Sequence, residues 1–309
     1  MMYNFFIAPL VDIVENPLFF IEVVIGGMST GIMYALVAMG FAIIFKASGI
    51  VNFAQGAMVL FAALTFVGQL EMGVPIWLAL LTTVAVMVVL AFAIERIVLG
   101  PLVNQPLIVL FMATIGLSFV IEGLGEMAWG SNVHALDIGL PRGSFFVGDV
   151  MVSRFDLTAA ASAAAMVLAI VIFMHKTKFG RALRAVADDH QAALSVGIPL
   201  RFIWIMVWSI AGVIALVGGI MWGTKSGVQF SLVLIAFKAL PVLILGGFTS
   251  VPGAIVGGLI IGAGEKIAEV FWGAAFGGAI EDWFAYILAM VFLLFRPQGL
   301  FGERIIERV

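Results

Sequence analysis

The chain contains no cysteine and few charged residues. Only 11% of its 309 residues are Asp, Glu, Lys or Arg, whereas soluble domains carry about 25%. Without cysteine there are no disulfides, no thiolate nucleophiles and no cysteine-ligated metals. Hydrophobic residues make up 63% of the chain and the mean hydropathy is +1.22. These values predict a polytopic membrane protein and exclude an ordinary soluble domain.

Residue arrangements typical of catalysis are also missing from the sequence. The three histidines, His134, His175 and His190, fall in predicted loops, and none belongs to a His-Glu-x-x-His metal motif. There is no Gly-x-Ser-x-Gly elbow and no Gly-Lys pair of the kind that a Walker A loop requires. We therefore expect a chain that is not an enzyme and binds no cofactor or metal. Any ATP hydrolysis that powers it would take place on a separate chain.

The N-terminal stretch holds Asp12 and Glu15 but no lysine or arginine. A secretory signal peptide begins with a basic segment, so none is expected here. The apolar runs that follow predict an all-α, polytopic helical membrane protein with about eight or nine transmembrane helices. Polar interruptions at residues 46–57 and 228–253 lie in opposite halves of the chain and are expected to be broken or re-entrant segments. Residues 1–309 are expected to form one transmembrane domain.

Two longer polar segments predict the orientation of the chain. Residues 130–156 carry charges of both signs with Gly and Pro, which favours a compact loop or hairpin. Residues 176–201 are rich in Lys and Arg, and basic loops of membrane proteins face the cytoplasm. The other basic positions assigned to the cytoplasmic side are Lys46, Arg96, Arg296, Arg304 and Arg308. We therefore expect the N-terminus and residues 130–156 to be extracytoplasmic and the C-terminus to be cytoplasmic.

The segment 176–201 is expected to contain an amphipathic helix. Its apolar residues recur at three-to-four spacing, Gly180 is a candidate N-cap, and Gly197 before a nearby proline is a stop signal. Cations near the start of a helix are mildly unfavourable, so local stability does not explain Arg181 and Arg184. Two interpretations remain open on charge alone. The segment is an ordinary solvated loop that orients the chain, or it docks to an acidic protein surface.

Five amide or ionisable side chains interrupt the apolar runs and are candidates for a solute pathway. Asn52 and Gln55 either form hydrogen bonds between helices or line a pathway. Lys238 either faces a cavity or extends to the membrane interface. Glu122 and Glu126 share one helical face, where they would bind a cationic or amide-bearing solute or relay protons. The alternative for both carboxylates is a place at the outer interface.

A further group of charges, Glu265, Lys266 and Glu269, lies near the end of a predicted span. Charged side chains are best tolerated where a span meets the headgroup region. We interpret this group as an interfacial cluster.

Five segments together resemble the permease subunits of branched-chain amino-acid ABC importers, the LivH-type family. The segments are residues 26–57, 113–123, 178–199, 238–262 and 293–302, and they include ATIGLSFVIEG at the second and LLFRPQGLFG at the last. Each motif is weakly specific by itself. Together they follow the family's order and spacing over nearly the whole chain, which makes the resemblance specific.

The resemblance implies an assembly and an activity. Such permeases pair with a second, homologous permease, with two cytoplasmic subunits that bind ATP and Mg, and with a soluble solute-binding protein. Residues 178–199 would hold the coupling helix that fits a groove of the ATPase. The residues implied in coupling are Arg181, Arg184, Ala187, Asp188, Asp189 and Gly197. Solute would cross a bacterial inner membrane between the two permeases, near the broken segments, as ATP binding drives alternating access.

Two departures from the family pattern concern the solute. After Asn-Phe-Ala the family commonly has His-Gly and an acidic residue, whereas this chain has Gln55, Gly56 and Ala57. Glu122 stands where a neutral amide is more usual. Both departures lie where the pathway is expected. The solute therefore stays open among branched-chain amino acids, other amino acids, urea, short-chain amides, and aromatic or carboxylic acids.

Two other functions fit the composition. A stand-alone secondary transporter or channel would use Glu122, Glu126 and Lys238 as ion or proton sites, but it needs no capped basic helix in the cytoplasm. A scaffold that moves no solute would leave the intramembrane amides and carboxylates unexplained. The importer is therefore the favoured function. A nucleic-acid partner is not expected.

Overall fold

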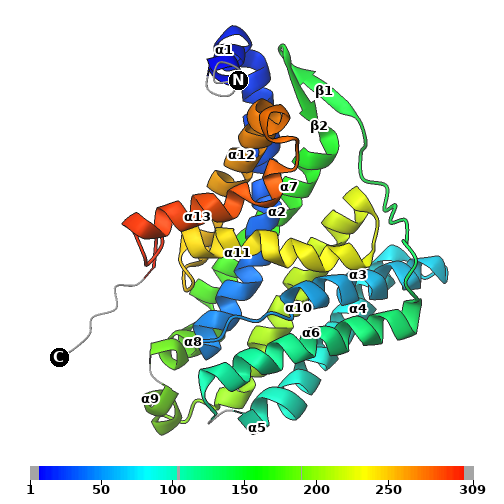
Figure 1. Cartoon of the computed structure of the whole chain (residues 1–309). Coiled ribbons are helices and arrows are strands. Elements are labelled where there is room, and N and C mark those ends of the chain that lie inside the picture. Colours follow the sequence, from blue (N-terminus) through cyan, green and yellow to red (C-terminus); the bar gives the residue numbers. More distant parts are fainter. Residues whose placement is uncertain (1–6, 103–104, 189, 303–309) are drawn as a thin grey trace. The chain divides into compact units, whose positions relative to one another are not determined.

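The computed structural model describes residues 7–102, 105–188 and 190–302, and helices dominate these ranges (Figure 1). The helices are α1 (Ala8–Glu15), α2 (Pro17–Ser48), α3 (Gln55–Glu71), α4 (Ile76–Ala93), α5 (Gly100–Leu102), α6 (Leu107–Trp129), α7 (Arg154–Lys176), α8 (Lys178–Asp188), α9 (His190–Ser195), α10 (Leu200–Ser226), α11 (Leu234–Gly246), α12 (Val251–Phe276) and α13 (Phe284–Phe295). A π-helix, Ile94–Leu99, joins α4 to α5, and 3₁₀ turns lie at Phe230–Val233 and Ile280–Asp282. The predicted all-α, polytopic class is confirmed.

The polar insertion at residues 130–156 contains a hairpin of two short strands. Strand β1 (Ser144–Val147) pairs antiparallel with β2 (Val150–Ser153), and Ser144 lies opposite Ser153. The prediction of a compact loop or hairpin is therefore confirmed. Helix α7 follows the second strand directly and begins at Arg154, so the insertion ends slightly earlier than predicted.

Five helical runs are long and apolar enough to cross a membrane: α2, the run Ile76–Leu102, α6, α7 and α10. The pair Phe230–Gly246 and Val251–Phe276 is bent by 114° at its break and makes a sixth span if it is counted as one. The apolar helices α3 and α13 are shorter. Within the described part of the chain, length and composition thus identify five candidate spans, or six with the bent pair, and the predicted number of eight or nine is not confirmed. Both predicted interruptions exist, between α2 and α3 and at the bent pair.

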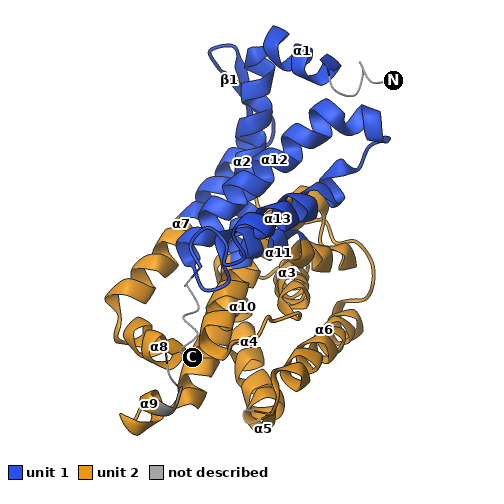
Figure 2. Ribbon diagram, turned by 60° about the vertical axis from the view of Figure 1, so that its left-hand side comes forward, with its two compact units in different colours: residues 1–38, 139–164, 238–309 blue, residues 39–138, 165–237 orange. Residues whose placement is uncertain are grey.

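The chain divides into two compact units, each built from separate stretches of sequence (Figure 2). Unit 1 comprises residues 1–38, 139–164 and 238–309, and unit 2 comprises residues 39–138 and 165–237. Because α2, α7 and α11 each contribute residues to both units, neither unit is an independent segment of the chain. The single-domain organisation expected from the sequence stays a prediction.

Helix α3 is the centre of unit 2. Of its 17 residues, 13 are buried, and it packs against α4, α6 and α10. Small residues allow this: a Cβ atom on Gly219 of α10 would lie 2.7 Å from the carbonyl oxygen of Val59, and Gly68 lies against the Trp129 ring. Close backbone approach at small residues is typical of helix packing in lipid. The 17-residue helix α3 is therefore enclosed by the longer helices α4, α6 and α10.

In unit 1, α2 and α12 touch through glycines. Gly27 and Gly31 on α2 face Gly258 and Gly262 on α12. A Cβ atom on Gly27 would lie 2.6 Å from the carbonyl oxygen of Gly262, and one on Gly31 would overlap the carbonyl of Gly258. Two small residues spaced by four on each helix let the two backbones approach until dispersion forces hold them. No larger side chain fits at this contact.

The end of α11 is completed by the C-terminal segment of the described chain. The backbone amides of Leu300 and Phe301 donate to the carbonyl oxygens of Leu245 and Gly246 at 2.8 and 3.1 Å. The last carbonyls of a helix lack partners within the helix. The sharp break between α11 and α12 therefore has its backbone groups satisfied by residues distant in sequence.

The glycine contact gives the first prediction. Replacing Gly27 with Ala should destabilise the folded chain by about 1–3 kcal/mol, the usual cost of overpacking, because the new methyl group meets the backbone of Gly262. The matched control is Gly26→Ala, next to it on the same helix, where nothing lies within 4 Å of the added atom. The measurement is the apparent unfolding temperature of the purified chain in detergent. Equal temperatures for both variants would contradict the tight contact.

Candidate functional site

Ion pairs and hydrogen bonds define the two ends of unit 2. At one end, Arg201 at the start of α10 bonds Glu95 just after α4, at 3.0 Å. At the other end, His134 after α6 bonds Glu71 at the end of α3, at 2.9 Å, and forms a backbone bridge with Val228 after α10. Helix α4 therefore runs antiparallel to α6 and α10 within this unit. We call the end with Glu95 and Arg201 the basic end.

Charges are unevenly divided between the two ends. The loops and helix termini at or leading to the basic end carry six cations, Arg96, Lys176, Lys178, Arg181, Arg184 and Arg201, together with the acidic residues Glu95 and Asp188. The other end carries Lys225 together with the acidic residues Glu71, Glu126 and Asp137. This asymmetry is the one that orients membrane proteins with their basic loops in the cytoplasm.

The predicted coupling segment forms two short helices, α8 and α9. Helix α8 is strongly amphipathic: Leu183 and Val186 are buried, whereas Arg181 and Asp188 are exposed. Ala187 is half-buried, and Asp189 lies outside the described residues. The amphipathic helix expected from the sequence is therefore confirmed, although it is shorter than expected and is followed by a second helix. Its role in coupling stays a prediction.

The prediction that Gly180 is the N-cap of this helix was wrong. Gly180 lies inside α8, where it is buried with its Cα against the carbonyl of Met174. Thr177 takes the capping role, because its Oγ1 accepts a hydrogen bond from the Gly180 amide at 3.1 Å. Threonine is a preferred N-cap for this reason. Arg184, half-buried, donates from Nη1 to the Met174 carbonyl at 3.0 Å, so α8 is tied to the end of α7.

Gly197 ends the segment as the sequence predicted. Its φ of +82° is left-handed, a conformation that glycine adopts at little cost. Its amide donates to the carbonyl of Leu194 and the amide of Ile198 donates to that of Ala193, both at 3.0 Å. This pair of bonds is the Schellman motif, which satisfies the last carbonyls of a helix. Helix α9 is thereby joined to α10 by a defined turn.

The two amides of the first interruption are fully buried in unit 2. Asn52 lies in the turn just before α3, where its Oδ1 accepts a hydrogen bond from the Ala54 amide at 3.0 Å, and its Nδ2 lies 3.5 Å from Oε1 of Gln55. Gln55 in turn donates to the carbonyl of Ala211 at 3.5 Å. Ala211 lies about 16 Å along α10 from Leu200, at 1.5 Å per residue, so the amides lie near the middle of the span. Within unit 2 Gln55 joins α3 to α10, whereas Asn52 bonds within the turn and the start of α3, and their place in a pathway stays a prediction.

The carboxylates of α6 lie away from its buried face. That face consists of Leu110, Thr114, Leu117, Ile121 and Gly125. Glu122 is half-buried and accepts a hydrogen bond from the Ser118 hydroxyl at 2.9 Å, whereas Glu126 is exposed. Glu122 lies about 10 Å from the end of the helix at Trp129, so it is within the span rather than at its end. The two carboxylates thus form a polar strip on a side of α6 that unit 2 leaves partly open.

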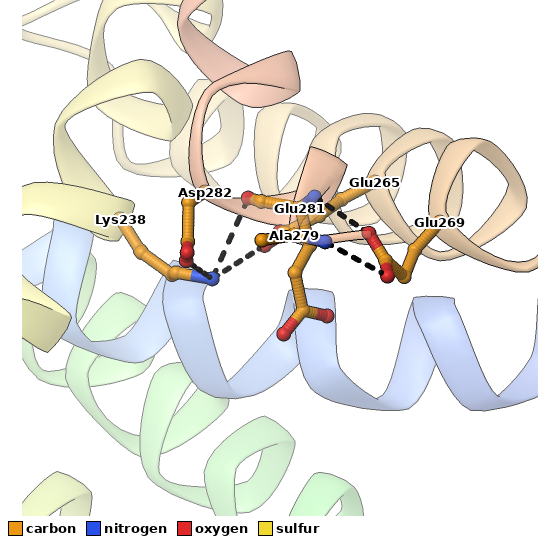
Figure 3. A network of polar contacts seen from close by, with 6 residues as sticks. All are labelled: Lys238, Glu265, Glu269, Ala279, Glu281 and Asp282. Atoms are coloured by element: carbon orange, nitrogen blue, oxygen red, sulfur yellow. Dashed lines mark hydrogen bonds and ion pairs between the residues drawn. The ribbon is translucent and has the colours of Figure 1, made fainter. Parts of the chain in front are cut away.

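Lys238 of unit 1 is held by three oxygen atoms (Figure 3). Its Nζ lies 3.0 Å from Oε1 of Glu265 and 3.1 Å from Oδ1 of Asp282, and it donates to the Glu281 carbonyl at 3.4 Å. The three N–H groups of an ammonium match three acceptors. The Glu265 side chain is only 5% exposed, so its carboxylate depends on Lys238 for neutralisation.

The interpretation of Glu265 as part of an interfacial cluster was therefore wrong. The residue lies in the middle of α12 and is buried. The prediction failed because its partner, Lys238, lies on another helix 27 residues earlier, and no local pattern indicated that pairing. Lys238 likewise does not extend toward the interface as a free cation. Glu269, also from that cluster, accepts hydrogen bonds from the amides of Ala279 and Glu281 at 3.2 and 3.1 Å and holds the turn before α13 (Figure 3).

The structure brings only some of the predicted pathway residues together. Asn52 and Gln55 form one buried cluster, and Glu122 and Glu126 form a separate strip within the same unit. Lys238 belongs to unit 1. Among the residues that the structure describes, no group of three or more His, Cys, Asp or Glu is placed to hold a metal.

The Lys238–Glu265 pair gives the second prediction. Replacing Lys238 with Met leaves a buried carboxylate without its cation, which typically costs about 3–5 kcal/mol. We expect a clear drop in the apparent unfolding temperature and in the yield of monodisperse protein. The double variant Lys238→Met with Glu265→Gln should recover most of the loss, because no charge remains buried. The control is Lys266→Met, which removes an exposed lysine next to Glu265 on α12. Failure of the double variant to recover would show that the pair is not the source of the loss.

Known proteins that are similar to this chain are transport permeases. The chain is 28% identical to the high-affinity branched-chain amino acid transport system permease protein BraD of Pseudomonas aeruginosa, over 94% of this chain and 98% of that one. It is also 28% identical to the corresponding protein LivH of Escherichia coli, over 96% and 99%. A solved structure, PsaBC from Streptococcus pneumoniae in complex with Fab, is similar at a TM-score of 0.49 with 17% identity, over 87% of this chain and 89% of that one.

The family comparison covers most of the sequence. Residues 23–295 match the family described as branched-chain amino acid transport system / permease component. The match includes the candidate spans, except for the first six residues of α2, and the segment between α7 and α10. This chain therefore belongs to the family of branched-chain amino-acid transport permease components.

Proposed function

We propose that this chain is the membrane-spanning permease of an ATP-driven importer for branched-chain amino acids or a closely related small polar solute. The observation that carries the proposal is the α8–α9 segment, an amphipathic and doubly capped element between two spans of a family permease. Solute would enter the cytoplasm across a bacterial inner membrane. The chain itself would bind neither ATP nor a metal.

Hydrogen bonds connect the α8–α9 segment to the two spans on either side of it, so a displacement of the segment would be transmitted to them. Thr177 and Arg184 tie α8 to the end of α7, and the Schellman turn at Gly197 ties α9 to the start of α10. A partner that displaces α8 and α9 therefore displaces the ends of two spans rather than a loose loop. Arg181 and Asp188 are exposed and are the side chains that such a partner would meet first. This supports docking over an ordinary solvated loop.

The partner for this segment would be a cytoplasmic subunit that binds ATP and Mg. The charge asymmetry of unit 2 supports a cytoplasmic place for the basic end, since basic loops are retained on that side. In this orientation the end with Glu71 and His134 and the hairpin of β1 and β2 would be extracytoplasmic. A soluble solute-binding protein would approach from there, and two such ATPase subunits would serve this permease and a second, homologous one.

The solute would cross between the two permeases. The strip of Glu122 and Glu126 on α6 supports this, because carboxylates within a span need a polar neighbour. Among the described residues of unit 2, the hydrogen-bond donor to Glu122 is the Ser118 hydroxyl alone. A carboxylate there suits the ammonium group of an amino acid. Urea, short-chain amides and organic acids remain candidate solutes within the same proposal.

One observation also favours a second function. The same Glu122 and Glu126 strip is what a stand-alone cation- or proton-coupled carrier would need. Such a carrier would move solute in vesicles that contain this chain alone and an ion gradient. The importer would move none without its ATPase and ATP.

The third prediction tests the class of transporter. A tagged copy of the chain, extracted gently from its native membrane, should co-purify with subunits that carry Walker motifs, identified by mass spectrometry. Vesicles made with the complete complex should take up a branched-chain amino acid only with ATP inside and the binding protein outside. Recovery of the chain alone, with uptake driven by an ion gradient, would replace the importer by the carrier.

The fourth prediction concerns coupling. Asp188→Arg reverses the charge of an exposed residue of α8 and should reduce ATP-dependent uptake by the complex about tenfold, equal to about 1.4 kcal/mol of docking free energy. The unfolding temperature of the chain should not change, because the side chain is exposed. Asp149→Arg, which changes an exposed acid in the hairpin turn between β1 and β2, outside the coupling segment, is the matched control. Full uptake by Asp188→Arg would remove α8 from the coupling surface.

A further inference from the structure

An open cavity of about 730 Å³ lies at the basic end of unit 2, apart from the residues assigned to coupling. One wall is the π-helix Ile94–Leu99 with Pro101, and the other is the first turn of α10 with Trp204. We call it the π-helix pocket. Its volume is in the range of small-molecule sites, about 300–1,000 Å³. π-Helical turns are rare and are found mostly at functional positions.

The charged wall of the pocket is held in place by a buried carboxylate. Glu95 is 4% exposed and accepts from Nε of Arg201 at 3.0 Å, while the Arg201 side chain is 47% exposed. The guanidinium is therefore held by Glu95 through its Nε, and about half of the Arg201 side chain is open to a ligand. Because the charges of Glu95 and Arg201 cancel, the neighbouring exposed Arg96 gives the wall a net positive charge.

The first turn of α10 adds to this potential. Pro199 is its N-cap and provides no side-chain cap, and both Pro199 and Leu200 line the pocket. The first amides of a helix have no acceptor within the helix and carry the positive end of its dipole. Arg96 on the π-helix wall and the start of α10 on the other wall favour an anion between them.

The rest of the lining is apolar. Pro101, Leu194, Leu200 and Trp204 contribute hydrocarbon, and Ile97 beside the pocket is 72% exposed. The spans Ile76–Leu102 and α10 end and begin here, which is where headgroups meet hydrocarbon in a membrane. A free inorganic anion would gain no binding free energy from these apolar walls. A molecule with an anionic head and hydrocarbon chains matches both.

We propose that the π-helix pocket binds an anionic phospholipid of the cytoplasmic leaflet, with its phosphate between Arg96 and the first turn of α10. The proposal rests on the cytoplasmic orientation proposed above for the basic end. The inner leaflet is rich in such lipids, and each nearby Lys or Arg adds to their binding. The bound lipid would join the end of α4 to the turn in which α9 ends and α10 begins, and so would stabilise the turn that ends the coupling segment.

The fifth prediction is a lipid-retention experiment on the purified full-length chain. In native mass spectrometry, wild-type protein should retain phosphatidylglycerol in preference to phosphatidylcholine. Arg96→Gln should lower that retention about fivefold, since one cation near the membrane surface contributes about 1 kcal/mol. Arg96→Lys should retain it. The matched control is Lys178→Gln, which removes a positive charge near the same end but outside the pocket.

Several outcomes would overturn the proposal. These are equal retention by Arg96→Gln and wild type, no preference over phosphatidylcholine, or competition by inorganic phosphate at millimolar concentration, which would make the ligand a free anion. A second experiment uses the wild-type protein, so it does not depend on how a variant folds. A phosphatidylglycerol with a photoreactive headgroup should crosslink to the protein within residues 94–101 or 199–204. Crosslinks found only elsewhere would also overturn it. Release of the lipid on adding the ATPase subunits would assign the pocket to an ATPase side chain instead.

The assay is independent of transport. Lipid retention needs no ATPase, ATP or solute, so failure here leaves the importer proposal intact, and failure of the importer leaves the pocket intact. Orientation is tested separately, because the chain has no native cysteine. Lys178→Cys should react with an impermeant thiol reagent only after the membrane is opened, and Asp149→Cys should react without it.

Discussion

Polar groups that enter the apolar interior of this chain have to find their partners within the chain, because hydrocarbon offers none. The buried amides of Asn52 and Gln55 bond to each other and to the backbone of α10, and the buried carboxylates of Glu265 and Glu95 meet Lys238 and Arg201. Each of these contacts joins segments that are far apart in sequence or restarts a helix at a break. The same requirement that satisfies the polar groups therefore also connects the elements of each unit.

Glycine supplies the complementary constraint. Lipid gives no hydrophobic force that would press helices together, so association depends on close contact between backbones. The facing glycines of α2 and α12, and Gly219 beside α3, are places where the backbone itself is the contact surface. Contacts of this kind leave the helices within each unit little room to shift against one another. Stiffness of that kind is what a transporter requires if a displacement at one end is to reach the other.

The coupling segment and the π-helix pocket meet at the start of α10. The turn at Gly197 fixes how α9 joins that helix, and Arg201, four residues later, is held by Glu95 of the π-helix. An ATPase that displaces α9 would therefore act on the same turn that a lipid phosphate would steady. In the proposed importer, a lipid of the cytoplasmic leaflet and the ATPase would both contact the turn between α9 and α10. The lipid composition of the membrane would therefore affect the transport rate.

The sequence by itself determined the class of molecule, the interrupted segments, the hairpin insertion, the amphipathic character of α8 and the stop at Gly197, because these depend on composition and on residues within one or two turns of each other. The family resemblance rested on such local motifs as well. Tertiary structure decided what each intramembrane charge does. Glu265 looked interfacial until folding placed Lys238 and Asp282 beside it, and the pocket exists only because Arg96 and Arg201, about a hundred residues apart, come together at Glu95. The partner of a buried charge depends on which helices pack together, and that packing depends on distant small residues whose pairing no local pattern encodes.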